Sequence, residues 1–589
     1  MFVDTGSGAV TNTDRPRRLP QSVRVLLAVC AFITLSANSG FFAAALRDRD
    51  IATPSTWGFA LALAVGVFAL HLLLASIAWL VLPQRAFKAV LALMLVLAAV
   101  AGYFVRQYGV VLDPGMLENV VNTDMAETRE LLSGTFALHL LLYAAVPLAL
   151  LWRTPMPLLP WRRAWVWRLL LPVLAAVLTA GALLSMFQPF SALMRNQKSL
   201  RYQLTPANVV WSLGAVAQRR LATPPGARQA IGIDAVAGPV MAAAPRPRVL
   251  LLVIGETARA ANWGLNAAKP GLAGNSARDT TPELARLPVL NFSDATACGT
   301  STEVSLPCMF APIGRRDYDE ARIRNSESLL HVLARAGVHV HWRDNQSGCK
   351  GVCQGLPGDE VAALNIAGLC SGGRCLDEGL VADLDERLRA LQRNDGKNGK
   401  DGKNGGNGTL GKDTYVWVLH MLGSHGPSYF RRYPPAFEHF TPVCKSDELR
   451  GCAPAEIANA YDNSLRYTDH VLATAVRTLQ AHAASVDAAM LFVSDHGESL
   501  GEAGLFLHGM PYPIAPDVQK RVPWVMWFGE GFAAGLALDL ACLRNKNAAP
   551  VAHDHLFHTV LGMVDVRTSV HEPAWDLING CRNSPVAAR

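Results

Sequence analysis

The stretch RVLLLVIGETARA, residues 248–260, marks the point at which the character of the chain changes. Six apolar residues follow Arg248 without interruption and lead into Gly255 and Glu256, after which the pattern becomes helical. A short apolar run that ends at a glycine and precedes a helix is typical of a strand buried on both faces of a sheet. The stretch therefore predicts the first strand of an α/β domain.

Three later runs have the same form: VHVHWRDNQS (338–347), TYVWVLHMLGSHGP (414–427) and DAAMLFVSDHGESLGE (487–502). Helical patterns separate the runs, and they cover residues 326–336, 378–393 and 455–481. Apolar strands that alternate with helices predict a mainly parallel sheet with helices on both of its faces. In such sheets, ligands bind at the carboxyl ends of the strands.

The first third of the chain differs from this domain because it is rich in long apolar runs. At 589 residues the chain is too long for one domain, and 51% of its residues are hydrophobic. A bilayer requires ~20 apolar residues for each crossing. The runs of that length predict five spans, at 23–46, 57–82, 86–108, 134–152 and 165–187.

The distribution of Arg and Lys predicts how these spans are oriented. The N-terminal tail, the turn after the second span and the connection 153–168 are basic, whereas the loop 47–56 is balanced and the loop 109–133 is acidic. Basic connections stay on the cytoplasmic side, so we expect everything after the fifth span to lie on the outer side. A cleaved signal peptide in place of the first span is the alternative, and it leaves the large domain on the same side.

Cysteine usage agrees with export, because ten of the eleven cysteines follow residue 297. Cysteines confined to the exported part indicate disulfides in an oxidising compartment. A metal site is the alternative, but the nearest pattern lacks a second closely spaced Cys/His pair. One sequence does not determine connectivity, nor the pairing of Cys542 and Cys581. The eight candidates that are near neighbours are Cys298, Cys308, Cys349, Cys353, Cys370, Cys375, Cys444 and Cys452.

Acidic and imidazole side chains stand where three of the predicted strands end. Glu256 follows the first strand, His420 and His425 follow the third, and Asp495 and His496 follow the fourth. Carboxylate and imidazole groups that meet at one edge of a sheet are typical ligands of a divalent metal, of which zinc is the leading candidate. Helix capping and loop solvation are the alternative interpretation.

The stretch TACGTSTEVSLPCMF, residues 296–310, supplies a candidate nucleophile. Thr300 and Glu303 have the spacing of a capping box, which predicts a helix that begins at this point. A helix N-terminus favours a phosphate group, and a metal ion at a hydroxyl oxygen stabilises the alkoxide. We therefore predict that Thr300 is the nucleophile of a phosphoryl transfer through a covalent phosphothreonine, and a simple helix cap is the alternative.

Six motifs in a fixed order resemble one known family: IGETARAANWGLN, ACGTSTEVSLPCMF, HMLGSHGPSY, YDNSLRYTD, SDHGESLGE and HDHLFHTVLG. The chain resembles the lipid A phosphoethanolamine transferases, which include the mobile colistin-resistance enzymes and belong to the alkaline phosphatase/sulfatase superfamily. The resemblance covers nearly the whole chain. It implies a five-span α-helical membrane domain at 1–190 with a periplasmic loop at 109–133, a linker with bridging helices at 191–245, and an alkaline-phosphatase-like α/β domain at 246–589.

The resemblance also implies roles for individual residues. Thr300 matches the nucleophile and, with Glu256, Asp495 and His496, the ligands of a catalytic zinc, with a second zinc possible during turnover. For each substrate residue taken alone, an ordinary loop or solvated position remains the alternative. Residues that match substrate-binding positions are Asn119, Thr123 and Glu127 in the loop, then Ser347, Lys350, His420, His425 and His508.

The implied activity is transfer of phosphoethanolamine from phosphatidylethanolamine to lipid A by a multi-pass enzyme of the bacterial inner membrane with a periplasmic catalytic domain. Lower susceptibility to polymyxin and colistin is the expected consequence. Alternatives are a related phosphoethanolamine or phosphoglycerol transferase acting on lipopolysaccharide core or a glucan, and a non-catalytic sensor. A sulfatase is disfavoured because no cysteine begins the C-x-P-x-R pattern. The net charge of +7 lacks long basic runs, so we expect no nucleic-acid partner.

Three further segments bear on this assignment. The polar insertion at 394–412 and the segment 260–280 depart from the expected pattern, and both concern access of the acceptor. His553, His555 and His558 form an additional histidine group, which we interpret as residues of a helix start and its packing, with placement near the site as the alternative.

Overall fold

The computed structural model describes all residues except 1–18, 48, 123–124, 197–199, 201, 223–227, 267–277, 372–373, 395–412 and 584–589. Most of the polar insertion and of the segment 260–280 therefore lies outside the described residues. The chain forms two compact units. The first contains residues 1–103 and 135–210, and the second contains residues 104–134 and 211–589. The connection between the third and fourth predicted spans thus belongs to the second unit.

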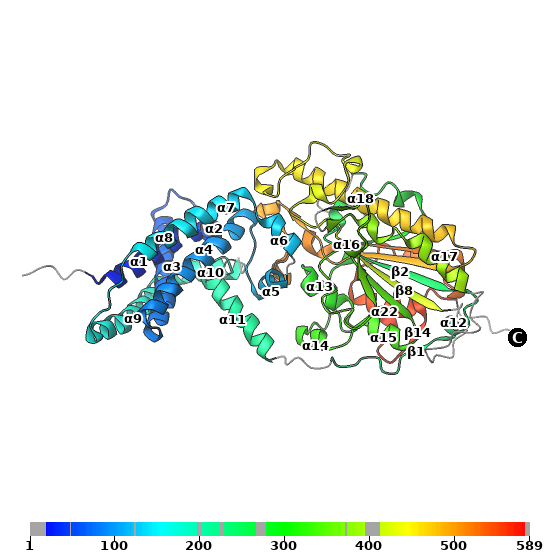
Figure 1. Ribbon diagram of the computed structural model, residues 1–589, viewed down its shortest axis with the longest axis horizontal. Helices are drawn as coiled ribbons and strands as arrows, with labels where there is room; N and C mark the ends of the chain where they lie inside the picture. The colour runs from blue at the N-terminus through cyan, green and yellow to red at the C-terminus, as the bar shows by residue number, and fades with distance from the viewer. Residues whose placement is uncertain are drawn as a thin grey trace, which may run out of the picture. The chain divides into compact units, whose positions relative to one another are not determined.

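The first unit is helical (Figure 1). Its long apolar helices are α3 (Pro54–Val81), α4 (Gln84–Tyr108), the continuous stretch Gly134–Arg153 made of α7, η1 and α8, and α9 (Trp161–Ser185). These four are long and apolar enough to cross a membrane. The pair α1 (Gln21–Ala37) and α2 (Ser39–Leu46) is bent by 57° and makes a fifth span if it is counted as one.

The bend between α1 and α2 has a local cause. Asn38 stands between the two helices, and its amide nitrogen donates to the carbonyl of Ile33 at 3.2 Å and to that of Thr205 at 2.9 Å. A side chain that takes the place of backbone hydrogen bonds interrupts a helix at that point. With this bent pair as one span, the structure agrees with the five predicted spans.

The second unit is built on an eight-stranded sheet with the order β13-β3-β12-β9-β2-β8-β4-β5. Only β12 runs antiparallel to its neighbours, so the sheet is mainly parallel, as predicted. The strands that arise from the four predicted runs lie together in the centre. The bounds are β2 Arg248–Gly255, β3 Leu290–Thr296, β4 His339–Asp344, β5 Gly358–Glu360, β8 Thr414–His420, β9 Asp487–Ser494, β12 Arg521–Phe528 and β13 Val551–Ala552.

Both faces of the sheet are covered, and β2 shows why its sequence is apolar throughout. Leu250, Leu252 and Ile254 pack in one core, whereas the alternate residues of the strand pack in another. The first core contains residues of α13 (Thr302–Met309), α15 (Leu329–Arg335) and α22 (Asp554–Val564). The second contains residues of α17 (Leu384–Asn394) and α18 (Pro454–Ala481). Figure 1 shows these two groups of helices on opposite sides of the strands.

Five disulfides close local loops of the second unit. The four pairs suggested by neighbouring positions form, namely Cys298–Cys308, Cys349–Cys353, Cys370–Cys375 and Cys444–Cys452. The remaining pair is Cys542–Cys581, and Cys30 is a free buried thiol. The prediction of disulfides among the cysteines after residue 297 is confirmed.

Candidate metal and nucleophile centre

The centre forms where β2 and β9 end. Glu256 directly follows β2, and Asp495 and His496 directly follow β9. The two strands are parallel neighbours in register up to Gly255 and Ser494, so the residues that follow them meet at one edge of the sheet. His496 Nε2 lies 3.4 Å from Glu256 Oε1 and 3.3 Å from Asp495 Oδ2. The structure thus brings these three predicted ligands together.

The donor set fits a divalent cation. One ligand atom from each of the three residues lies within 4.8 Å of the others, and all three side chains are fully buried. Neither Glu256 Oε1 nor Asp495 Oδ2 accepts a hydrogen bond from any residue that the structure describes. Buried carboxylate oxygens are costly unless a donor or a cation compensates them. Two carboxylates and an imidazole suit zinc, with a fourth position left for another ligand.

The charges of the three groups also favour a bound cation. Burial acts to lower the pKa of His496, but the charges of Asp495 and Glu256 raise it to about 10. Burial and the charge of Glu256 raise the pKa of Asp495 to about 6. Burial opposes ionisation of Glu256, yet the close approach and charge of His496 hold its pKa below the ordinary value. The centre therefore carries excess negative charge that attracts a positive group.

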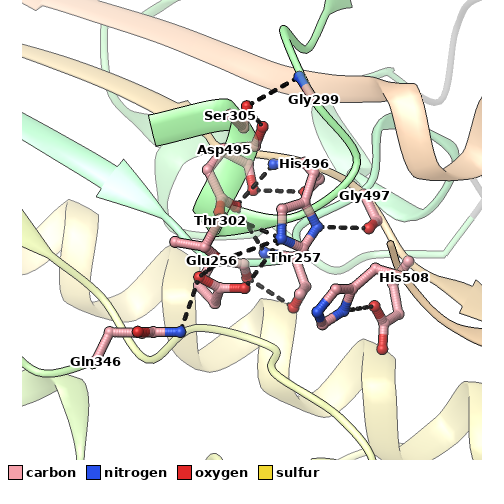
Figure 2. A network of polar contacts seen from close by, with 12 residues as sticks. Glu256, Thr257, Gly299, Thr302, Ser305, Gln346, Asp495, His496, Gly497 and His508 are labelled. Atoms are coloured by element: carbon pink, nitrogen blue, oxygen red, sulfur yellow. Dashed lines mark hydrogen bonds and ion pairs between the residues drawn. The ribbon is translucent and has the colours of Figure 1, made fainter. Parts of the chain in front are cut away.

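The hydroxyl that faces this centre belongs to Thr302 (Figure 2). It does not belong to Thr300. Thr302 Oγ1 donates to Glu256 Oε2 at 3.0 Å and lies 3.3 Å from His496 Nε2. Thr300 Oγ1 instead donates to the carbonyl of Met510 at 2.5 Å. The expectation that Thr300 joins Glu256, Asp495 and His496 is thus not what the geometry shows.

The physical reason lies in where α13 begins. The capping-box prediction placed the helix cap at Thr300, but α13 starts at Thr302 with Ser301 as its N-cap, and no side chain caps it. The turn before it is tight, since a Cβ on Gly299 would lie 2.8 Å from the backbone nitrogen of Ser305. The N-cap is therefore one residue later than predicted, and Thr302, the first residue of α13, directs its hydroxyl toward Glu256.

His553 and Ser305 hold the turn before α13 in place. His553 Nδ1 accepts a hydrogen bond from the backbone nitrogen of Cys298 at 3.0 Å, and its Nε2 lies 2.9 Å from the carbonyl of Ser494. Burial lowers the pKa of His553 to about 3, so the ring is neutral. Ser305, within α13, bonds to the carbonyl of Asp495 (Figure 2). The packing interpretation of the 553–558 histidines holds for His553, which supports the site from behind.

A second group of histidines lies beside the centre. The ring centroid of His508 is 4.4 Å from that of His496 and 5.3 Å from that of His425. His508 Nδ1 lies 2.8 Å from Glu498 Oε2, which fixes the orientation of the ring (Figure 2). Burial lowers the pKa of His425 to about 3. The structure therefore places His508 next to His496, and His425 next to His508.

His420 lies deeper, at the end of β8. Its Nδ1 is 2.7 Å from Asp344 Oδ1, and its Nε2 has no hydrogen-bond partner among the described residues. The backbone of His420 is paired with Asp344 of β4 in the sheet, which accounts for the contact. His420 therefore lies at the sheet edge of the site, where its side chain contacts β4.

The loop after β4 contributes a residue that the sequence interpretation missed. Gln346 Nε2 donates to Glu256 Oε2 at 3.3 Å. Lys350 Nζ donates to Ser347 Oγ at 2.8 Å, so these two predicted residues lie together in the same loop, which the Cys349–Cys353 disulfide closes. The only sequence signal for Gln346 was its position two residues after the end of a predicted strand, and many solvated loop residues share that position.

Two helices of the 104–134 connection also reach this region. These are α5 (Pro114–Asn122) and α6 (Met125–Leu131), and α5 packs beside α13 (Figure 1). A Cβ on Gly509 would lie 3.6 Å from Asn119 Nδ2, and the nitrogen of Gly509 donates to the carbonyl of Thr300 at 2.6 Å. Asn119 is therefore near residues 300–302, which we call the nucleophile segment. Thr123 and the side chain of Glu127 lie outside the described residues.

Comparison with known proteins gives matches over nearly the whole chain. A sulfatase family model matches residues 248–566, and a model described as phosphoethanolamine transferase EptA/EptB matches residues 67–221. The phosphoethanolamine transferase EptA of Salmonella typhimurium is 35% identical over 95% of this chain and 96% of its own length. The phosphatidylethanolamine transferase Mcr-1 of Escherichia coli is 36% identical over 87% of this chain and 90% of its own length.

A solved structure extends the similarity to the membrane part. It is the integral membrane protein lipooligosaccharide phosphoethanolamine transferase A from Neisseria meningitidis, with 32% sequence identity and a TM-score of 0.86. The match covers 95% of this chain and 99% of that chain.

Proposed function

This chain belongs to the family of phosphoethanolamine transferases that includes EptA and Mcr-1, and we propose that it transfers phosphoethanolamine from phosphatidylethanolamine to lipid A. The enzyme lies in the bacterial inner membrane with its catalytic domain in the periplasm. The observation that carries the mechanism is the hydroxyl of Thr302, within hydrogen-bond distance of Glu256 and His496. Thr302 replaces Thr300 as the nucleophile in this proposal.

In the first step, Thr302 Oγ attacks the phosphorus of the donor. The new Oγ–P bond forms as the P–O bond to diacylglycerol breaks, and the hydroxyl proton leaves along the hydrogen bond to Glu256 Oε2. The departing diacylglycerol oxygen takes up a proton, which we assign to His508, because this ring lies beside His496 and contacts Glu498. The N-terminus of α13 adds free backbone N–H groups that favour the phosphate.

In the second step, a phosphate oxygen of lipid A attacks the phosphorus of the phosphothreonine. The P–Oγ bond breaks, Thr302 recovers its proton, and phosphoethanolamine remains on the acceptor. Glu256, Asp495 and His496 would hold a zinc ion, which stabilises negative charge on the threonine oxygen when it is bound. Two displacements of this kind imply ping-pong kinetics.

Modification of lipid A phosphates by a cationic headgroup lowers negative charge at the cell surface. We therefore propose that cells with this enzyme bind cationic polymyxins, including colistin, less strongly. Mass spectrometry of lipid A from cells with and without the protein tests the function directly. An added phosphoethanolamine on lipid A supports the proposal. An unchanged lipid A with phosphoethanolamine on core sugars or a glucan would assign the chain to a different acceptor.

A further inference from the structure

We propose that Glu118 and Glu130, on helices α5 and α6, are positioning residues that hold the membrane-side loop against the reaction centre through Arg324 and Arg432. The proposal rests on the proposed function, because it concerns how a lipid donor reaches Thr302. The loop 104–134 is continuous at both ends with helices that are apolar enough to cross a membrane, yet it belongs to the same compact unit as the catalytic residues. Something must therefore attach it to the catalytic part.

The first link runs from α6 to His425. Arg432 Nη1 donates to Glu130 Oε1 at 3.1 Å, and Arg432 Nη2 bonds to Glu130 Oε2, so the pair is bidentate. Arg374 Nε lies 3.0 Å from Glu130 Oε1. The third nitrogen of the same guanidinium, Arg432 Nε, donates to the carbonyl of His425 at 2.7 Å. One arginine thus connects the loop helix to the backbone of a histidine beside the centre.

This first link is buried and charged. The side chain of Arg432 is 1% exposed and that of Glu130 is 6% exposed. Burial acts to raise the pKa of Glu130, but the charge and hydrogen bonds of Arg432, aided by Arg374, hold it below the ordinary value. A bidentate pair of this kind restricts geometry as well as contributing energy, because the two planar groups must stay parallel.

The second link runs from α5 to the start of α13. Arg324, on α14 (Glu320–Asn325), places Nη2 at 3.2 Å from Glu118 Oε2. Its Nη1 donates to Glu303 Oε1 at 2.9 Å. Glu303 is the residue directly after Thr302 in α13. The second link therefore ends one residue from the nucleophile.

The two links share one design. Each begins at a carboxylate of the loop and passes through one guanidinium. The first ends on the backbone of His425, beside the centre, and the second ends on Glu303, which adjoins Thr302. Between them, Met116 and Asn119 of α5 lie against Gly509. Since the donor headgroup must be presented from the membrane side, a loop held at two points fixes where that headgroup meets Thr302. A water-soluble diester does not depend on this presentation.

The test uses the full-length protein in detergent micelles and compares two substrates. One is phosphatidylethanolamine, with release of diacylglycerol as the readout, and the other is p-nitrophenyl phosphoethanolamine, a soluble diester. We expect Glu130→Gln and Glu118→Gln to raise the KM for the lipid about tenfold. Turnover of the soluble diester is expected to stay within about twofold of wild type, with bound metal unchanged.

Glu320→Gln is the matched control. Glu320 also bonds to Arg324, at 3.2 Å, but it lies on α14 itself. Its replacement therefore removes a carboxylate from Arg324 and leaves the link between Glu118 and Glu303 intact. It is expected to behave as wild type with both substrates. Glu130→Asp keeps the charge and is expected to recover part of the lost affinity for the lipid.

Two outcomes would overturn the inference. Parallel loss of both activities, together with a lower melting temperature, would make the links ordinary structural ion pairs. Unchanged kinetics in both variants would make them irrelevant to presentation. A Glu130→Gln protein that fails to fold counts as the structural outcome for that link, and Glu118→Gln then decides the other. A wild type that cleaves the soluble diester but not the lipid would instead show that the proposed donor is wrong.

Discussion

Thr302 Oγ1 donates a hydrogen bond to Glu256 Oε2 at 3.0 Å and so connects the first turn of α13 to the residue that follows β2. The contact joins two segments that are separated by more than forty positions in the sequence. It orients the hydroxyl toward the one place in the described chain where two carboxylates and an imidazole converge. The chemistry that we propose depends on this contact more than on any other.

The first prediction separates the two threonines. Thr302→Ala is expected to lower transfer about a thousandfold or more, because it removes the group that carries the phosphoethanolamine. Thr300→Val is the matched control, since it removes only a hydrogen bond to the carbonyl of Met510. We expect it to retain substantial activity. The measurement is diacylglycerol release by each purified variant.

Adduct mapping provides a second measurement for the same question. Enzyme given donor lipid and no acceptor is expected to carry one phosphoethanolamine on Thr302, seen by peptide fragmentation. An adduct on Thr300, or full activity of Thr302→Ala, would return the nucleophile to the residue that the sequence pattern favoured.

The difference between these two threonines shows where sequence interpretation reached its limit. Continuous apolar runs predicted the central strands. Glu256, Asp495 and His496 directly follow two of these strands, and their position predicted that they meet, because parallel strands end at one edge of the sheet. The choice between Thr300 and Thr302 depends on the residue at which α13 begins. The turn at Gly299 sets that residue through three-dimensional crowding, which a local S/T-x-x-E pattern does not contain.

Long-range contacts of loop residues were beyond prediction for a related reason. Gln346 follows β4 in a loop, and Arg432 directly follows the short 3-10 turn Tyr429–Arg431. Only the folded chain brings Gln346 to Glu256 and Arg432 to Glu130. No periodicity or spacing in the sequence distinguishes such residues from their neighbours.

The second prediction concerns metal. We expect purified wild-type protein to contain about one zinc ion in each chain, and Asp495→Asn to contain far less. Removal of the ion by a chelator is expected to lower the melting temperature by ~4 °C if the free metal had been a hundredfold above its dissociation constant. Elemental analysis and thermal unfolding give the two readouts.

Asp344→Asn is the control for the metal prediction. Asp344 bonds to His420 and is not one of the three converging ligands. We expect it to keep its metal. If it loses metal to the same extent as Asp495→Asn, His420 and its partner belong to the ligand set.

The third prediction ranks the disulfides. A cross-link stabilises mainly by restricting the unfolded chain, and the effect grows with loop length. Cys542–Cys581 closes a separation of 39 residues and Cys349–Cys353 a separation of 4. Paired replacement by alanine is expected to cost about 4 kcal/mol for the first and about 2 kcal/mol for the second. Thermal unfolding of both double variants that gives the reverse order would contradict the ranking.

The fourth prediction is a pH dependence that arises from His553. Its pKa is about 3 in the folded protein because of burial, against about 6.5 for an exposed histidine. Between these values the unfolded chain binds a proton that the folded chain does not. The stability contributed by the neutral ring is therefore complete above pH ~6.5 and declines as the pH falls, by about 1.4 kcal/mol per pH unit.

His553→Gln tests this pH dependence. The variant is expected to be less stable than wild type at pH 8, because the bonds to Cys298 and Ser494 are weakened. Its stability is expected to fall less steeply between pH 6.5 and about pH 4, since glutamine does not titrate. Unfolding midpoints measured at pH 8, 6.5, 5.5 and 4.5 give the slopes, and identical slopes would exclude His553 as the cause.

The last prediction concerns Gly509, which lies between the nucleophile segment and α5. Its φ of 86° is left-handed, and a Cβ there would come within 2.5 Å of Met116 Cε and 3.6 Å of Asn119 Nδ2. Gly504, in the same region, has φ 76°, but its added Cβ would meet only Arg450 Nη2, at 3.8 Å. Alanine at either position is expected to cost about 1–2 kcal/mol of stability through backbone strain. Only Gly509→Ala forces the side chain of Met116 on α5 to move, so only that variant is expected to raise the KM for the lipid donor while metal content stays constant. Equal kinetic effects of the two variants would show that strain in the loop, and not the contact with α5, controls the reaction.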